Sequence, residues 1–282
     1  MTPRYYDAHN HLQDGRFGGR QSALIGQCVA AGVAHMVVNG SCEEDWPQVL
    51  ELARASGSAR HSVVVPSFGY HPWYIHERTE DWRKNLIHHL DQSPSAVGEI
   101  GLDRWKPGLD YTDQEDVFIA QLQIAAERNL PASIHCLQTW GRMLEILKAG
   151  PRPRCGFLLH SYGGPKEMVE SFARLGAFFS LPGYYAHERK ERQRETFRHI
   201  PPERLLIETD APDQMLPQMQ NDFVSTAVIA LADKKTGKPL NHPANLPAVY
   251  AFAAALLGEP VESLAARVEE NFFRLFGTLI RQ

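Results

Sequence analysis

Short apolar runs recur along the chain, and longer amphipathic stretches separate them. Each run is rich in β-branched or aromatic residues and is bounded by glycine, proline or a polar cluster, as is typical of a buried strand. The runs cover residues 5–9, 35–39, 62–68, 96–100, 131–135, 156–160, 177–181 and 205–210. The pattern therefore predicts eight strands.

The stretches between these runs predict helices. Residues 111–129 carry an apolar face, and Thr112 followed by Glu115 matches the capping box that starts many helices. Three other stretches, 21–32, 43–57 and 165–176, end at a glycine that would cap a helix. A charged helix over 188–200 and two apolar helices over 246–258 and 260–277 complete the prediction.

Strands that alternate with helices favour an α/β fold built from parallel βα units. Eight such units match a closed (β/α)8 TIM barrel with its helices outside, and a doubly wound open sheet is the alternative. The chain has 282 residues and no repeat or linker that divides it, so we expect one barrel domain over residues 1–282. The segment 213–245 breaks the alternation. We expect a helix within 222–235 and an exposed loop over 234–243 near the barrel mouth.

Ionisable residues fall where several predicted strands end. His9 and His11 lie two positions apart, and residues with this spacing project from the same face of a strand. Asp7 shares that face, either as a metal ligand or as a residue that orients an imidazole. The other ionisable residues at strand ends are Glu99, His135, His160 and Asp210.

In barrel enzymes the carboxyl ends of the strands carry the active site. Four imidazoles and two carboxylates at that end suit Zn²⁺, Mn²⁺ or a related divalent ion. The pattern therefore predicts a metal centre at the mouth of the barrel.

Composition narrows the classes of partner. The formal net charge of −4 differs from the strongly basic surface of proteins that grip long nucleic acids, although bound metal ions can supply positive charge locally. The four cysteines form no C-x-x-C pair, no signal-peptide core precedes the first run, and no apolar stretch reaches the length of a membrane span. We expect reduced thiols in a cytoplasmic protein, with no membrane association and no obligate protein partner.

Seven motifs follow one another along the chain. They are DAHNHL (7–12), GYHPW (69–73), VGEIGLD (97–103), SIHC (133–136), LLHSYGG (158–164), LLIETDAP (205–212) and NFFRLF (271–276). In this order they resemble the TatD-like metal-dependent hydrolases, which are amidohydrolase-like barrels. The resemblance spans nearly the whole chain and implies a (β/α)8 barrel with two divalent ions, such as Zn²⁺, Mn²⁺ or Mg²⁺.

The resemblance also implies how the ligands divide. It places one ion on His9, His11 and Asp210, a second on His135 and His160, and Glu99 as the bridge between them. It implies a phosphodiesterase or deoxyribonuclease that uses a metal-activated water, with DNA or another phosphodiester as substrate. In that reaction Asp210 would accept a proton and Glu99 would set the spacing of the ions.

This chain departs from the family pattern near the substrate. It lacks the arginines that many members carry shortly after the position of His135 and in the stretch after Asp210. The guanidinium fork of arginine suits phosphate, so the missing arginines weaken the case for a phosphodiester substrate. Hydrolysis of an amide, lactone, ester or small phosphoester is therefore an alternative. A non-catalytic barrel with a structural metal is a third reading, but a structural zinc site is normally closed with four ligands.

Other residues near the predicted mouth have two readings. His71 either contacts the substrate or is a structural turn residue before Pro72. Trp73, Trp105 and Tyr184 either pack at the rim or stack on a nucleobase.

Overall fold

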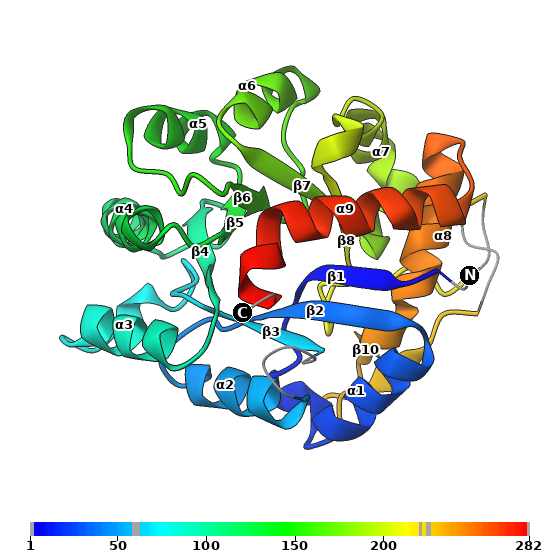
Figure 1. Ribbon diagram of the computed structural model, residues 1–282, viewed down its shortest axis with the longest axis horizontal. Helices are drawn as coiled ribbons and strands as arrows, with labels where there is room; N and C mark the ends of the chain where they lie inside the picture. The colour runs from blue at the N-terminus through cyan, green and yellow to red at the C-terminus, as the bar shows by residue number, and fades with distance from the viewer. Residues whose placement is uncertain (1–2, 58–62, 220–221, 224–226, 281–282) are drawn as a thin grey trace.

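The computed structural model describes residues 3–57, 63–219, 222–223 and 227–280. Strands β1 to β8 are all parallel and follow one another in sequence order around a single sheet (Figure 1). Their bounds are Tyr5–Asn10, Val33–Asn39, Val64–Phe68, Ala96–Asp103, Ala132–Leu137, Phe157–Leu159, Ala177–Pro182 and Leu205–Glu208. All eight predicted runs are strands, although Ser62 of the third run lies outside the described residues.

The sheet closes on itself where β8 returns beside β1. The Asp210 backbone N–H donates to the His9 carbonyl (3.0 Å), and the His11 N–H donates to the Ala211 carbonyl (2.8 Å). These contacts close the TIM barrel, so the open-sheet alternative is wrong. Every residue of β3, β4, β7 and β8 is buried, as expected for parallel strands that are covered on both faces.

Helices α1 to α7 connect successive barrel strands, α8 follows β10, and all eight lie outside the barrel (Figure 1). Their bounds are Gln21–Ala30, Trp46–Ala55, Trp82–Gln92, Tyr111–Arg128, Trp140–Ala149, Val169–Arg174, Glu191–Phe197 and Leu246–Leu257. Helices α3 and α5 were not among the predicted helices. Helix α3 buries Trp82, Leu86 and Leu90, which are four residues apart and therefore line one face.

The start of α4 differs from the predicted capping box. The Asp110 side chain accepts a hydrogen bond from the Asp113 backbone N–H (3.1 Å), so Asp110 caps the helix. Glu115 instead pairs with Arg142 of α5 (2.7 Å). The prediction of a Thr112–Glu115 box was wrong because an aspartate two residues earlier supplies the cap.

The helix predicted within 222–235 is also wrong in the part that the structure describes. Strands β9 (Ala230–Ala232) and β10 (Pro239–Asn241) form an antiparallel hairpin there, while residues 224–226 lie outside the described residues. The loop predicted over 234–243 therefore contains the hairpin turn and β10. Asn245 ties the hairpin to α8, since its side chain donates to the Ile229 carbonyl (2.8 Å) and accepts from the Ile229 N–H (2.9 Å).

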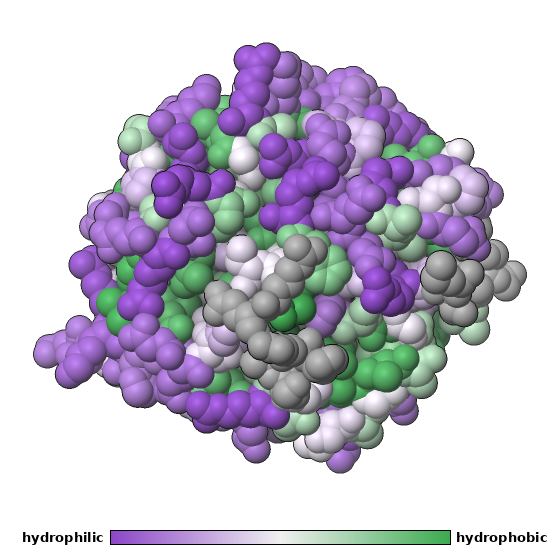
Figure 2. Space-filling model, in the orientation of Figure 1, coloured by the Kyte–Doolittle hydropathy of each residue, from purple (hydrophilic) through white to green (hydrophobic). Residues whose placement is uncertain are grey.

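Helix α9 (Val261–Ile280) lies across the amino-terminal end of the barrel (Figure 1). Its Phe272 ring packs on Tyr6 at the start of β1, and its Asn271 amide donates to the Leu205 carbonyl at the start of β8. Figure 2 shows this face of the molecule, where hydrophilic side chains predominate around smaller apolar patches.

Two further predictions concern the chain as a whole. All four cysteines are free thiols, as predicted. Among the described residues no single helix is long and apolar enough to cross a membrane; Pro243–Leu257 and Val261–Ile280 reach that length and composition only as a pair, bent by 107° at their junction.

Candidate metal centre

The predicted site residues meet at the carboxyl ends of the strands. His9 lies in β1, Glu99 in β4 and His135 in β5, while His11, His71, His160 and Asp210 follow β1, β3, β6 and β8. Six of these seven residues are buried, and His11 is partly exposed. The structure therefore gathers every residue that the sequence placed in the centre.

The Glu99 carboxylate lies at the middle of this group. Its Oε2 faces the Nε2 atoms of His11 (3.1 Å) and His9 (3.4 Å). Its Oε1 faces Nε2 of His160 (2.8 Å) and Nδ1 of His135 (2.9 Å). Each carboxylate oxygen thus faces a different pair of imidazoles, which is the arrangement expected of a ligand that bridges two metal ions.

Both imidazoles of the first pair are oriented from behind. His9 Nδ1 lies 2.8 Å from the Ser133 hydroxyl, and His11 Nδ1 lies 2.8 Å from the Asn39 carbonyl oxygen. These partners leave the two Nε2 atoms, 3.3 Å apart, pointing at Glu99. Such outer hydrogen bonds fix the ring orientation of metal-binding histidines in known sites.

The second pair is held differently. His135 Nε2 lies 2.8 Å from Asp103 Oδ2, so this ring presents its Nδ1 to the centre. His160 presents Nε2, and its buried Nδ1 has no hydrogen-bond partner among the described residues. The nearest carboxylate oxygen to that Nδ1 is Oε1 of Glu208, at 3.8 Å.

Asp210 lies on the side of the first pair. Its Oδ1 is 3.7 Å from His9 Nε2 and 3.8 Å from His11 Nε2. Its Oδ2 accepts a hydrogen bond from the Gln214 amide (2.7 Å), which also donates to the Ser161 hydroxyl (2.6 Å). Gln214 therefore holds one carboxylate oxygen and leaves the other facing the imidazoles.

Burial and mutual charge set the protonation of the group. Burial lowers the pKa of His9 to about 4 and that of His71 to about 4, so both rings are neutral at pH 7. Burial acts against the charged form of Glu99 as well, but the imidazoles of His71, His160, His9 and His11 outweigh it and keep the pKa of Glu99 well below its usual range. Burial also acts against the charged form of His11, but the Glu99 carboxylate outweighs it and raises the pKa of His11 to about 9. Burial raises the pKa of Asp210 to about 7.

The donor set fits divalent metal ions. Potential ligand atoms lie within 4.8 Å of one another in the groups His9–His11–Glu99 and His71–Glu99–His135, which share the Glu99 carboxylate. A third group, His9–His160–Glu208, lies beside them. Imidazole and carboxylate together suit Zn²⁺, Mn²⁺ and their neighbours.

His71 differs from the other imidazoles in its hydrogen bonding. Its Nδ1 accepts from the Trp73 backbone N–H (3.1 Å), which assigns the ring proton to Nε2 in the neutral form. That Nε2 lies 3.4 Å from Glu99 Oε1 and borders the cavity above the centre. The ring is therefore placed as a hydrogen-bond donor.

Two carboxylates near the ligands have other partners. Asp7 accepts from the backbone N–H and the hydroxyl of Thr209, so it joins β1 to β8. Glu208 accepts from the hydroxyls of Ser161 and Ser180.

Sequence reasoning missed Asp103 and Gln214. Asp103 reads as an ordinary turn residue at the end of GLD, because its partners His135 and Trp73 are distant in the sequence. Gln214 lies in the irregular stretch after Asp210. The available signal was that Asp103 ends a strand that carries Glu99 and that Gln214 follows Asp210 by four residues.

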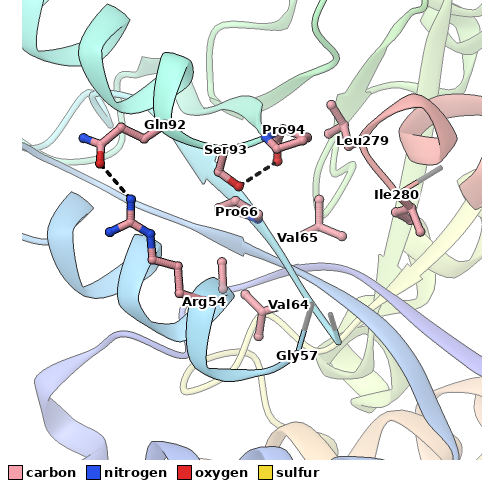
Figure 3. Close-up of a pocket in the computed structure, with 11 residues that line it drawn as sticks. Arg54, Gly57, Val64, Val65, Pro66, Gln92, Ser93, Pro94, Leu279 and Ile280 are labelled. Atoms are coloured by element: carbon pink, nitrogen blue, oxygen red, sulfur yellow. Dashed lines mark hydrogen bonds between the residues drawn. The ribbon is translucent and has the colours of Figure 1, made fainter. Parts of the chain in front are cut away.

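The metal centre opens into a cavity of about 550 Å³ at the carboxyl end of the barrel. A separate hollow of about 280 Å³ lies at the other end, between α2, β3, α3 and the end of α9 (Figure 3). Val64, Val65, Leu279 and Ile280 line it, and none of its described lining residues is a histidine or a carboxylate. The chemistry of the molecule is therefore concentrated at the carboxyl end.

Comparison with known proteins agrees with this geometry. A family model described as TatD related DNase matches residues 6–277. The 3'-5' ssDNA/RNA exonuclease TatD of Salmonella typhimurium is 31% identical over 96% of this chain and 98% of its own length. YjjV of Escherichia coli K12, described as an uncharacterized metal-dependent hydrolase, is 28% identical over 98% of this chain and 99% of its own.

Solved structures give the same result. The crystal structure of YjjV from Escherichia coli K12 superposes with a TM-score of 0.84 at 27% identity, covering 98% of this chain and 99% of that one. A TatD family hydrolase from Entamoeba histolytica, at 18% identity, shares the fold with a TM-score of 0.83, covering 98% of this chain and 99% of its own. With the family model matched over almost the full length, the chain belongs to the TatD related DNase family of metal-dependent hydrolases.

Proposed function

We propose that this protein is a phosphodiesterase that shortens single-stranded nucleic acid from its 3′ end. The observation that carries the proposal is Glu99, whose two oxygens face two separate imidazole pairs. A carboxylate in this position suits a two-ion centre, which is a common device for displacement at phosphorus. The names of the TatD relatives support the choice of substrate.

The residues divide between two divalent ions. His9, His11 and Asp210 would hold one, His135 and His160 the other, and Glu99 both. Ions bound there would polarise the phosphoryl group and acidify water, which is the chemistry that the side chains alone lack.

Asp210 is proposed as the proton acceptor. Gln214 fixes its Oδ2, so Oδ1 is presented toward the imidazole pair at the mouth. A carboxylate held in this way is positioned to take the proton of an attacking water. The same aspartate would therefore act as ligand and as general base.

His71 is proposed to bind the substrate. His71 lines the cavity with its Nε2 3.4 Å from Glu99 Oε1, and burial keeps the ring neutral. A neutral donor at this position suits a phosphoryl oxygen and partly replaces the arginines that the chain lacks.

The test is hydrolysis of a 5′-labelled single-stranded DNA oligonucleotide by protein reconstituted with Mn²⁺ or Zn²⁺. We expect stepwise shortening from the 3′ end, reduced about 100-fold or more in Asp210→Asn, because positioned acid–base groups contribute that much. Asp116→Asn, an exposed change on α4, is the matched control and should keep full activity. Hydrolysis of esters or lactones but of no oligonucleotide, by protein shown to carry its metals, would overturn the proposal.

A further inference from the structure

The cavity above the metal centre continues into two unlike lobes. We call the first the aromatic lobe; its rim residues are Trp73, Trp105, Leu137, Tyr184 and Lys190. We call the second the acidic lobe, of about 300 Å³; its rim carboxylates are Asp14, Glu44, Asp45, Glu77 and Asp213. The two lobes meet at five residues that line both, so a substrate at the centre meets both lobes; the five are His11, His71, Trp73, Glu99 and Asp213.

Trp105 dominates the aromatic lobe. Its side chain is 60% exposed, and Leu137 across the lobe is 37% exposed. Most large apolar side chains of the chain are buried in the core, so two exposed ones that face the same cavity indicate a surface for an apolar ligand group.

The exposed indole is held in place. Its ring stacks on Trp73, with ring centroids 6.1 Å apart and 27° between the planes. Asp103 fixes both residues, because Oδ1 accepts from the Trp105 backbone N–H (2.6 Å) and Oδ2 accepts from the Trp73 indole N–H (2.8 Å). A planar group that binds here would lose little free energy in ordering the protein.

The Trp73 ring also lies close to the metal centre. Its centroid is 6.3 Å from the His135 ring and 5.1 Å from the His71 ring. Trp105 stacks on the outer side of Trp73, so a group attached next to the reacting atoms lies close to its ring.

The two lobes differ in the charged side chains around them. Lys106 lies over the Trp73 ring (4.9 Å) and Lys190 over the Tyr184 ring (4.8 Å), so cations flank the aromatic lobe. In the acidic lobe, Arg16 is the basic side chain among the described lining residues, and it is already paired with Asp14 and Asp213 (2.7 Å each). Asp213 lines both lobes, but the four other rim carboxylates line the acidic lobe alone. A polyanionic chain is therefore repelled more strongly from the acidic lobe than from the aromatic one.

We propose that the aromatic lobe is a nucleobase subsite in which Trp105 stacks on a base next to the scissile phosphate. The remaining strand runs past Lys106 and Lys190, and the acidic lobe excludes a further phosphate. The inference rests on the proposed phosphodiesterase function and adds the group that positions its substrate. An aromatic plate stacks on any base, so the subsite selects for a nucleotide rather than for a sequence.

The experiment compares kcat/KM for wild-type and Trp105 variants on oligonucleotides with and without bases at the scissile phosphate. Trp105→Ala should lower kcat/KM for a base-bearing oligonucleotide by about 10-fold or more, and Trp105→Phe should retain most of it. An oligonucleotide with abasic residues flanking the scissile phosphate should be a poorer substrate for the wild-type protein by a similar factor, and Trp105→Ala should cause no further loss on it. Val29→Ala, an exposed apolar change on α1, is the matched control.

Binding gives a readout that is independent of hydrolysis. Base-bearing oligonucleotide should quench the tryptophan fluorescence of the Asp210→Asn protein, and the quenching should weaken in Asp210→Asn/Trp105→Ala and with the abasic strand. Equal loss from Trp105→Ala on both substrates, or full activity of Trp105→Ala, would overturn the subsite while hydrolysis by the wild type upholds the proposed function. Binding that depends on Trp105, without hydrolysis of any oligonucleotide, would uphold the subsite and overturn the proposed phosphodiesterase function.

Discussion

Asp103 shows how one side chain joins the metal centre to the proposed substrate surface. Its Oδ2 accepts from His135 Nε2 and from the Trp73 indole, and its Oδ1 accepts from the backbone N–H groups of Trp105 and Lys106. Burial favours the protonated acid, but these hydrogen bonds outweigh it and lower the pKa of Asp103 to about 2. The residue therefore stays ionised and orients His135.

We expect Asp103→Asn to weaken metal binding about 10- to 100-fold, because the partner that orients His135 is lost. Titration against a chromogenic chelator measures this affinity, and circular dichroism checks the fold. Asp116→Asn on α4 is the matched control. An unchanged affinity in Asp103→Asn would show that His135 needs no orientation from Asp103.

The gathering of the candidate ligands was predictable at the residue scale, whereas their supports were not. The sequence singled out six residues because charged groups at the ends of apolar strands need a partner or a metal: His9, His11, Glu99, His135, His160 and Asp210. Asp103 and Gln214 act through contacts between distant segments, and a local pattern contains no record of such contacts.

Secondary-structure elements were predictable where they bury a face. All eight barrel strands follow from their apolar runs, but β9 and β10 are three residues long and largely exposed in β9, so they carry no periodic signal. The start of α4 was misplaced for a related reason. Two acceptors, Asp110 and Thr112, lie close together in the sequence, and only the structure shows which one bonds the helix.

The cap assignment at α4 is directly testable. Asp110→Ala should lower the free energy of unfolding by about 0.5–2 kcal/mol, because the Asp113 N–H loses its acceptor. Thr112→Ala should change it by less. Urea unfolding of both variants measures the difference, and a larger loss in Thr112→Ala would restore the capping box.

Glu43 links the loop after β2 to α3 and gives a prediction of pH dependence. Burial acts to raise the pKa of Glu43, but hydrogen bonds from the Asn85 amide, the Thr79 N–H and hydroxyl, and the Tyr70 hydroxyl lower it. A carboxylate with a lowered folded-state pKa stabilises the fold above the unfolded-state pKa. That stabilisation is lost as the pH falls through the folded-state pKa.

We therefore expect Glu43→Gln to be less stable than the wild type at pH 7. Its free energy of unfolding should also fall less steeply from about pH 5 to about pH 3, the range in which a carboxylate of this kind takes up its proton. Urea unfolding across that range measures both quantities. Parallel pH curves for the two proteins would contradict the role given to Glu43.

At the scale of the whole molecule, the two ends of the barrel differ: one end is packed by a helix and the other carries the candidate metal centre. Helix α9 and the apolar hollow of Figure 3 lie at the amino-terminal end, and the metal centre with its two lobes lies at the carboxyl end. The fold was predictable because alternating βα units admit few topologies. The polarity of the cavity was not, because it depends on which loops meet at the mouth.

Metal binding should stabilise the whole barrel, since the proposed ligands come from β1, β4, β5 and the ends of β6 and β8. At a metal concentration about 100 times the Kd, the gain is about 2.7 kcal/mol, which corresponds to a rise in Tm of roughly 5 °C. Differential scanning fluorimetry with and without a chelator measures it. An unchanged Tm at saturating metal would show that these elements do not share an ion.

Anomalous diffraction from crystals loaded with Mn²⁺ tests the central claim most directly. The account predicts two peaks, one on each side of the Glu99 carboxylate, with His9, His11 and Asp210 around the first and His135 and His160 around the second. A single peak, or a peak between His9, His160 and Glu208, would contradict it.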